Sequence, residues 1–165
     1  MTELAPQIDL LTAAWKRRYF LVQLARAVGE AQRFRQPLAL IHLDVDDLQE
    51  HNDVHGQGSV DGALSWLAVR MSNILDGRGP IGRLDGGAFA TFVPLTLQPA
   101  LKMAERIRRT VPQTKHASAF GDYRLTISAG VAALRRGEPW GNLFEAAENA
   151  CRKAKQGGRD GVVHR

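Results

Sequence analysis

The hydrophobic positions of this chain repeat at intervals that predict four helices. In four segments, apolar residues recur every three or four positions, a spacing that places them on one face of a helix. The segments run from Thr12 to about Phe34, from Val60 to Leu75, from Leu97 to Val111 and from Leu143 to Ala154. Pro37, Pro112 and the glycine pair 157–158 follow three of these segments, and each is expected to end its helix.

Shorter apolar runs between the helices predict five strands. Residues 38–43 are almost all apolar, as is typical of a buried central strand, and residues 81–93 hold two apolar segments around an Asp-Gly-Gly turn. Residues 123–134 alternate and predict a strand with a kink or bulge at Gly130, while residues 162–163 predict a last edge strand. This order of elements predicts an α+β layered fold, in which helices flank a central mixed five-stranded sheet.

The length of the chain is that of one domain. We expect an N-terminal lead over residues 1–11 and a single domain over residues 12–165. A chain of 165 residues buries roughly 70% of its unfolded surface, so it needs no disulfide or metal to fold. The lone Cys151 excludes a disulfide framework and favours a reducing compartment.

Composition narrows the expected location and partners. No apolar run reaches the ~18 residues of a membrane helix, and the N-terminus has no signal-peptide pattern. We therefore expect a cytoplasmic protein with no membrane contact. The chain has 22 Lys and Arg against 17 Asp and Glu, a net charge of +5, which favours an anionic partner. The basic residues are scattered and not interleaved with aromatic residues, which speaks against nucleic acid.

Acidic residues follow the predicted central strand directly. Asp44, Asp46 and Asp47 lie where a layered α/β fold usually binds ligands, and adjacent carboxylates suit Mg²⁺. The alternative is a strand end followed by an Asp helix cap. Asn52 and Asp61 flank a glycine-containing turn and together can read a guanine edge. Asp61 alone is equally explained as an acid in the first turn of a helix.

Two other polar pairs are candidates for ligand contact. His51 and His55 have the four-residue spacing of helical metal ligands, but no third ligand has matching spacing, and two solvated imidazoles explain them as well. Lys155 and Arg159 lie on either side of the glycine pair and can bind a phosphate chain. They are also explained as cations at a helix C-terminus.

Together and in order, these blocks resemble the GGDEF domain of the diguanylate cyclase family, and the likeness runs from about Asp9 to the C-terminus. The family has four such blocks: D-x-L-T, a D-x-D block followed by N-D, an S-x-G-V strand and a C-terminal A-x-x-A-K-x-x-G-R. The matching residues are Asp9, Leu11 and Thr12, then Asp44, Asp46, Asn52, Asp53, Gly56 and Asp61, then Ser128, Gly130 and Val131, and last Ala150, Ala154, Lys155, Gly158 and Arg159. The last block is slightly loosened, because Ala150 and Ala154 are four positions apart.

The resemblance implies a fold similar to nucleotide cyclases and polymerase palms, with the namesake motif on a β-hairpin. Active members of the family pair two domains, each with one GTP, and form cyclic di-GMP. The resemblance also assigns roles: Mg²⁺ binding to Asp44 and the carbonyl of Val45, guanine recognition to Asn52 and Asp61, and phosphate contact to Lys155 and Arg159.

The namesake motif is degenerate in this chain. The family's R-Y-G-G-D-E-F aligns with residues 83–89, so the two acids become Gly87 and Ala88. Aligning the glycine pairs instead, Gly86 onto the family's first glycine, places Ala88 and Phe89 there, and neither register restores an acid. Because those acids complete the metal site and help activate the attacking hydroxyl, we expect no catalytic residues in this motif. Asp85, on the turn, is the neighbouring acid.

Other departures agree with this interpretation. Gln49 and Gln57 replace a family Lys and His, and Val60 replaces a Gly. The R-x-x-D product-inhibition site would fall on residues 76–79, which read D-G-R-G, so it is absent. About eleven residues precede the domain, so the module that usually pairs two such domains is expected to be missing from this chain.

The sequence thus predicts a catalytically inactive GGDEF-like signalling or interaction module in bacterial cyclic di-GMP signalling. We expect it to retain GTP or other guanine-nucleotide binding, with a weak, incomplete Mg²⁺ site and a protein partner on the hairpin or the first helix. Two alternatives stay open. One is a residual diguanylate cyclase with Asp44, Asp46 and Asp85 as metal ligands, and the other is a scaffold whose nucleotide pocket is vestigial.

Overall fold

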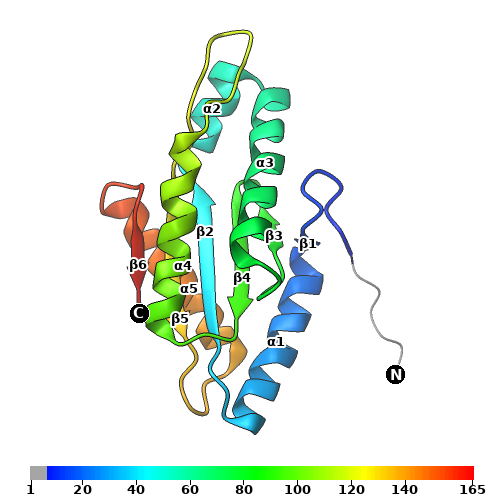
Figure 1. The fold of residues 1–165 in the computed structure, drawn as a ribbon, viewed down its shortest axis with the longest axis vertical. Helices are drawn as coiled ribbons and strands as arrows, with labels where there is room; N and C mark the ends of the chain where they lie inside the picture. Colours follow the sequence, from blue (N-terminus) through cyan, green and yellow to red (C-terminus); the bar gives the residue numbers. More distant parts are fainter. Residues whose placement is uncertain (1–6) are drawn as a thin grey trace.

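Six strands pair into one mixed sheet in the order β1-β3-β4-β2-β5-β6, and helices cover both faces (Figure 1). The structure is a computed structural model that describes residues 7–165, so the first six residues of the expected lead lie outside the described residues. The strands are β1 (Trp15–Lys16), β2 (Ala39–Val45), β3 (Gly82–Asp85), β4 (Ala88–Val93), β5 (Ile127–Ala133) and β6 (Val162–His164). The helices are α1 (Arg17–Phe34), α2 (Leu48–His55), α3 (Gln57–Leu75), α4 (Leu97–Thr110) and α5 (Trp140–Gln156), with a short 3-10 helix at Val111–Gln113.

The central strand β2 determines the layers. It is antiparallel to both β4 and β5, whereas the outer pairs β1–β3 and β5–β6 are parallel. Alternate side chains of a strand point to opposite faces of the sheet. Ile41 and Leu43 accordingly join the core under α3 and α4, while Leu40 joins the core under α1 and α5. Burial on both faces explains why this strand is almost entirely apolar.

The predicted α+β layered fold is confirmed, with two corrections at its edges. The sheet has six strands because Trp15 and Lys16 form β1 beside β3, where the sequence predicted the start of the first helix. A two-residue strand is too short to show an alternating pattern. The sequence also predicted no helix over residues 48–55, where α2 lies. None of its residues is buried, so it has no apolar face for the sequence to reveal.

Gly130 lies inside β5, and the predicted kink or bulge there was wrong. The pairing of β5 with β2 continues through it without a shift in register. A Cβ at Gly130 would lie 2.1 Å from the carbonyl oxygen of Ala147 and 2.2 Å from the amide nitrogen of Cys151. The glycine therefore lets the backbone of α5 approach the sheet closely. Burial raises the pKa of the neighbouring Cys151 thiol to about 12, so this residue is not a nucleophile at neutral pH.

No helix in the described part of the chain is both long enough and apolar enough to span a bilayer.

We expect Gly130→Ala to lower the free energy of unfolding by about 3 kcal/mol or more, because the added methyl group meets backbone that cannot move aside. Gly29→Ala is the matched control. Its Cβ meets nothing within 4 Å inside α1, so it should raise stability by roughly 0.5–1 kcal/mol. Urea unfolding followed by circular dichroism measures both, and equal effects of the two variants would contradict the close approach of α5.

Candidate functional site

A buried carboxylate just beyond the end of β2 connects the parts of the candidate site. Asp46 is only 1% exposed. Its Oδ1 accepts a hydrogen bond from Ser128 Oγ (2.7 Å), and its Oδ2 accepts one from Thr126 Oγ1 (2.7 Å) and one from the amide of Asp160 (3.1 Å). One side chain thus joins β2 to the start of β5 and to the loop that follows α5. Both carboxylate oxygens of this candidate metal ligand are used inside the protein.

The ammonium group of Lys155 lies among the oxygens at the end of β2. Lys155 Nζ is 3.4 Å from Asp44 Oδ2, 3.5 Å from Asp46 Oδ1 and 3.4 Å from the carbonyl oxygen of Val45. Burial raises the pKa of the Asp44 carboxyl; Lys155 opposes this rise, and the carboxylates of Asp46 and Asp85 add to it. Asp44 and the carbonyl of Val45 are the oxygens that the family resemblance assigns to Mg²⁺. Here a side-chain cation contacts both.

The residues present at this position do not fit a catalytic Mg²⁺ site. Hard cations need several oxygen ligands, and the hairpin positions Gly87 and Ala88 have no side-chain oxygen to add to Asp44. Within residues 7–165, no group of three or more His, Cys, Asp or Glu side chains is arranged to hold a metal ion. Of the remaining donors, Asp44 and the carbonyl of Val45 contact Lys155, and Asp85 Oδ1 accepts a hydrogen bond from the amide of Gly86.

The β3–β4 hairpin places Ala88 between two carboxylates. Ala88 pairs with Asp44 of β2 on one side and with Asp85 of β3 on the other, so the three residues lie abreast in the sheet. Gly87 is buried, and its carbonyl accepts a hydrogen bond from the amide of Val45 (3.0 Å). A Cβ at Gly87 would lie 3.0 Å from Leu48 Cδ2, so an acid there would require Leu48 to move.

Arg83 fixes the turn of this hairpin to the N-terminal segment. Its Nε and Nη2 donate to the carbonyl of Gly86 (3.0 and 2.9 Å), and its Nη1 donates to Asp9 Oδ2 (3.1 Å). The same oxygen of Asp9 accepts hydrogen bonds from the amide and the hydroxyl of Thr12. Burial alone would raise the pKa of Asp9, but the bonds from Thr12 and Arg83 lower it. Sequence reasoning noted these three residues as motif positions and missed that they form one network.

The two predicted guanine-reading residues lie in consecutive helices separated by Gly56, whose φ of 82° breaks the helical path. Asn52 lies in α2 and Asp61 in α3, and both are half-buried. Asn52 Oδ1 is buried, and no donor within residues 7–165 reaches it. An unsatisfied buried acceptor costs about 1–3 kcal/mol, so a ligand that donates a hydrogen bond to it would be favoured.

Arg159 and Asp47 close the site on the side of α2. Arg159 Nε lies 3.1 Å from Asp47 Oδ1, with both side chains about half exposed. Asp47 immediately precedes α2, yet its side chain caps no backbone amide of that helix. Both residues have a positive φ, 65° and 53°, in the loops that follow α5 and β2. The structure therefore brings Asp44, Val45, Lys155, Asp47 and Arg159 to the same end of the sheet.

The histidines weighed as metal ligands instead stack against Tyr123. The ring centroids of His51 and His55 lie 5.4 and 4.1 Å from that of Tyr123, and His55 Nδ1 is 2.9 Å from Ser118 Oγ. Burial lowers the pKa of His51. These contacts attach the segment that precedes β5, which contains Ser118 and Tyr123, to α2, the helix that contains Asn52.

We expect Asp46→Asn to lower the free energy of unfolding by about 3 kcal/mol, because an amide cannot accept all three hydrogen bonds and leaves Lys155 with less negative charge. The matched control is Asp53→Asn, an exposed position that accepts one bond from Gln49, where the change should stay within about 0.5 kcal/mol. Chemical denaturation measures both. A loss below about 1 kcal/mol for Asp46→Asn would contradict the connecting role of this carboxylate.

Comparisons with known proteins agree with this geometry. Residues 6–161 match the family described as diguanylate cyclase, GGDEF domain. The response regulator PleD of Caulobacter vibrioides is 33% identical over 159 residues, which cover 94% of this chain and 35% of PleD. The chain spans about half, or less, of the length of the curated relatives it matches.

Solved structures of similar domains include two that were determined with a bound partner. The GGDEF domain of DgcB from Caulobacter crescentus, in complex with c-di-GMP, superposes with a TM-score of 0.92 at 26% identity, covering 99% of this chain and 98% of that one. The diguanylate cyclase SiaD of Pseudomonas aeruginosa, in complex with its activator SiaC, gives a TM-score of 0.90 at 33% identity, covering 96% and 61%.

Proposed function

Because the chain belongs to the GGDEF family of diguanylate cyclase domains, we propose that it is a catalytically inactive member that binds a guanine nucleotide without consuming it. In this proposal the domain acts in cyclic di-GMP signalling, and the nucleotide is an effector. An effector shifts a conformational equilibrium only through its different affinities for the two states.

One observation carries the proposal. The ammonium group of Lys155 lies at the position where a metal-dependent enzyme would hold its metal ion, and the acids that would bind that ion are missing from the hairpin. Lys155 contacts Asp44 and the carbonyl of Val45, and Ala88 occupies the strand position between Asp44 and Asp85. Phosphoryl transfer depends on cations that neutralise developing charge and on groups that position the attacking hydroxyl. Without acids at Gly87 and Ala88, this site lacks ligands for such cations.

The polar groups that would recognise the nucleotide are retained. Asn52 Oδ1 is buried with no donor in reach among the described residues, and Asp61 is half-buried nearby in the sequence. Lys155 and Arg159 supply two cations at the adjoining end of the sheet. A nucleotide phosphate would compete with Asp44 and Asp47 for these cations, so we expect weak binding that depends little on Mg²⁺.

A protein partner that responds to the bound state is part of this proposal. The candidate surfaces are the β3–β4 hairpin and α1, where Val22 and Phe34 are exposed apolar side chains. The related cyclase SiaD has been seen in complex with a protein activator, which supports a partner for this domain as well. A scaffold with a vestigial pocket would use the same surfaces without any effect of nucleotide.

Calorimetric titration with a non-hydrolysable GTP analogue tests the binding site. We expect binding that an ATP analogue does not reproduce and that Asp61→Ala weakens roughly tenfold or more, because a charged acceptor for the base is lost. Asp53→Ala, an exposed acid of α2, is the matched control and should bind normally. Absence of heat at sub-millimolar nucleotide would contradict nucleotide binding and favour the scaffold.

Turnover is tested separately. We expect no cyclic di-GMP from GTP with either Mg²⁺ or Mn²⁺, measured chromatographically at high protein concentration, because positions 87 and 88 contribute no ligand. Cyclic di-GMP that disappears in Asp44→Ala and in Asp85→Ala would instead establish the residual cyclase, with these two acids as its metal ligands.

A further inference from the structure

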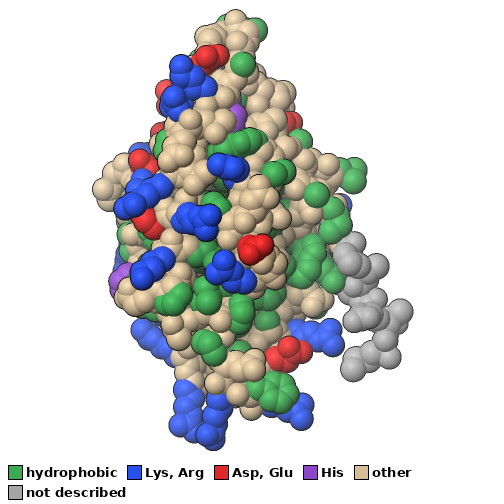
Figure 2. Space-filling view, viewed as in Figure 1, with side chains coloured by type: hydrophobic (Ala, Val, Ile, Leu, Met, Phe, Trp, Pro, Cys, Tyr) green, Lys and Arg blue, Asp and Glu red, His purple; other side chains and the backbone are tan. Residues whose placement is uncertain are grey.

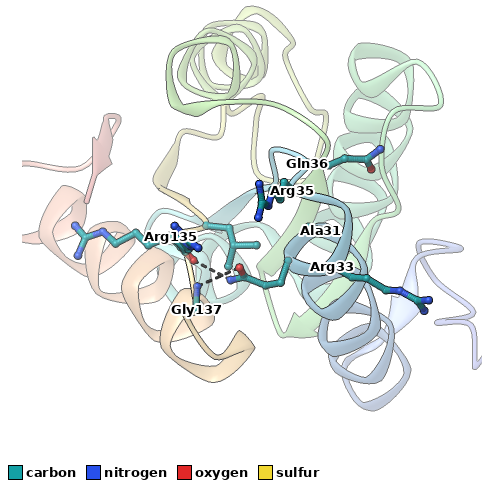
Figure 3. A pocket seen from close by; sticks show the side chains of 9 residues that line it. Ala31, Arg33, Arg35, Gln36, Arg135 and Gly137 are labelled. Atoms are coloured by element: carbon teal, nitrogen blue, oxygen red, sulfur yellow. Dashed lines mark hydrogen bonds between the residues drawn. The ribbon is translucent and has the colours of Figure 1, made fainter.

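A cavity opens at the end of the sheet opposite Asp44. It lies between the C-terminus of α1 and the loop that joins β5 to α5, with a volume of about 660 Å³ (Figure 3). The seven-residue strand β2 rises about 3.3 Å per residue, so the cavity is roughly 20 Å from the nucleotide site proposed above. Its volume is within the range of small-molecule sites in proteins.

All the charged side chains that line this cavity are arginines: Arg33, Arg35, Arg135 and Arg136. Within residues 7–165, none of their guanidinium groups forms an ion pair, and Arg33 instead lies over the ring of Phe34. The adjacent acid, Glu138, is already paired with Arg165. Figure 2 shows Lys and Arg side chains gathered at the same lower end of the molecule. Glu138 also interacts electrostatically with Arg135, so it offsets part of this charge, and the cavity keeps a net positive potential.

The walls of the cavity are fixed to each other. Gln32 Nε2 donates to the carbonyl of Arg135 (2.8 Å), and Gln32 Oε1 accepts from the amide of Gly137 (3.1 Å), as the dashed lines in Figure 3 indicate. The amide of Leu134 donates to the carbonyl of Leu38 (2.8 Å). A preformed cavity needs less ordering when a ligand binds.

Arg35 occupies a backbone position that usually favours glycine. Its φ of 53° is the left-handed conformation of a residue that follows a helix, where a side chain is strained. Figure 3 shows Arg35 and Arg135 on opposite sides of the cavity, whereas Arg33 points away along α1.

We propose that this cavity binds a small, soluble molecule that carries at least two linked phosphate groups, with Arg35 and Arg135 contacting them from opposite sides. Guanidinium groups form paired hydrogen bonds with phosphate oxygens, and several unpaired arginines require a multiply charged anion. The volume of the cavity suits a small molecule. This site is separate from the guanine site and does not depend on it.

Calorimetric titration of the full chain with pyrophosphate tests the proposal. We expect pyrophosphate to bind to the unaltered chain. In the double variant Arg35→Gly/Arg135→Gln, the affinity should fall roughly tenfold or more for each arginine that is removed. Glycine relieves the strained backbone at position 35, so this variant should remain folded, which circular dichroism checks. The matched control is Lys102→Gln/Arg106→Gln, which removes two exposed cations from α4 and should bind pyrophosphate normally.

The background variant Arg159→Gln separates the two sites, because it removes an exposed cation that would contact phosphate at the nucleotide site. Pyrophosphate binding should survive in it, whatever its effect on the GTP analogue. No binding at millimolar pyrophosphate would overturn the cavity site and leave the guanine site untouched. Equal weakening in the α4 control would also overturn it, because the binding would then reflect net charge only.

Discussion

The buried carboxylate of Asp46 is the constraint on which this end of the molecule depends. A charge removed from water is costly unless hydrogen bonds and an opposite charge compensate it. Asp46 obtains that compensation from Thr126, Ser128, the amide of Asp160 and the ammonium of Lys155. Meeting this requirement places the end of α5 and the loop after it against the end of β2. Lys155 is thereby held beside Asp44 and the carbonyl of Val45.

The charge balance of the site follows from that placement. Position 88 lies between Asp85 and Asp44 on neighbouring strands. Like charges directly opposite each other in a sheet are destabilising. A third carboxylate at position 88 would need a bound cation to offset the repulsion. With Ala88 there, no third carboxylate is present, and the ammonium of Lys155 offsets part of the negative charge of Asp44 and Asp46. The lack of acids at positions 87 and 88 and the lysine contacts are thus mutually consistent, and Arg83 connects the hairpin turn to Asp9.

Two groups of cations lie at opposite ends of the sheet, separated by the length of β2. At one end, Lys155 and Arg159 are paired with Asp44 and Asp47, so an anion must compete with carboxylates. At the other end, Arg35 and Arg135 line a cavity whose described lining contains no acidic side chain. The two ends therefore differ in how much positive potential they offer to a ligand, although the same strand supports both.

The sequence by itself determined the major helices, the central strand and the hairpin, because each has a local apolar period or turn composition. It could not reveal β1, which is too short for a pattern, or α2, which has no fully buried residue. At the site it indicated Asp44, Asn52, Asp61, Lys155 and Arg159 as separate motif residues. Only the tertiary structure decided that Lys155 contacts Val45 across 110 positions of sequence, and that Asp46 and Asp9 hold distant segments together. Such contacts depend on how α5 and the N-terminal segment pack against the sheet. The spacing of residues along the chain contains no information about that packing.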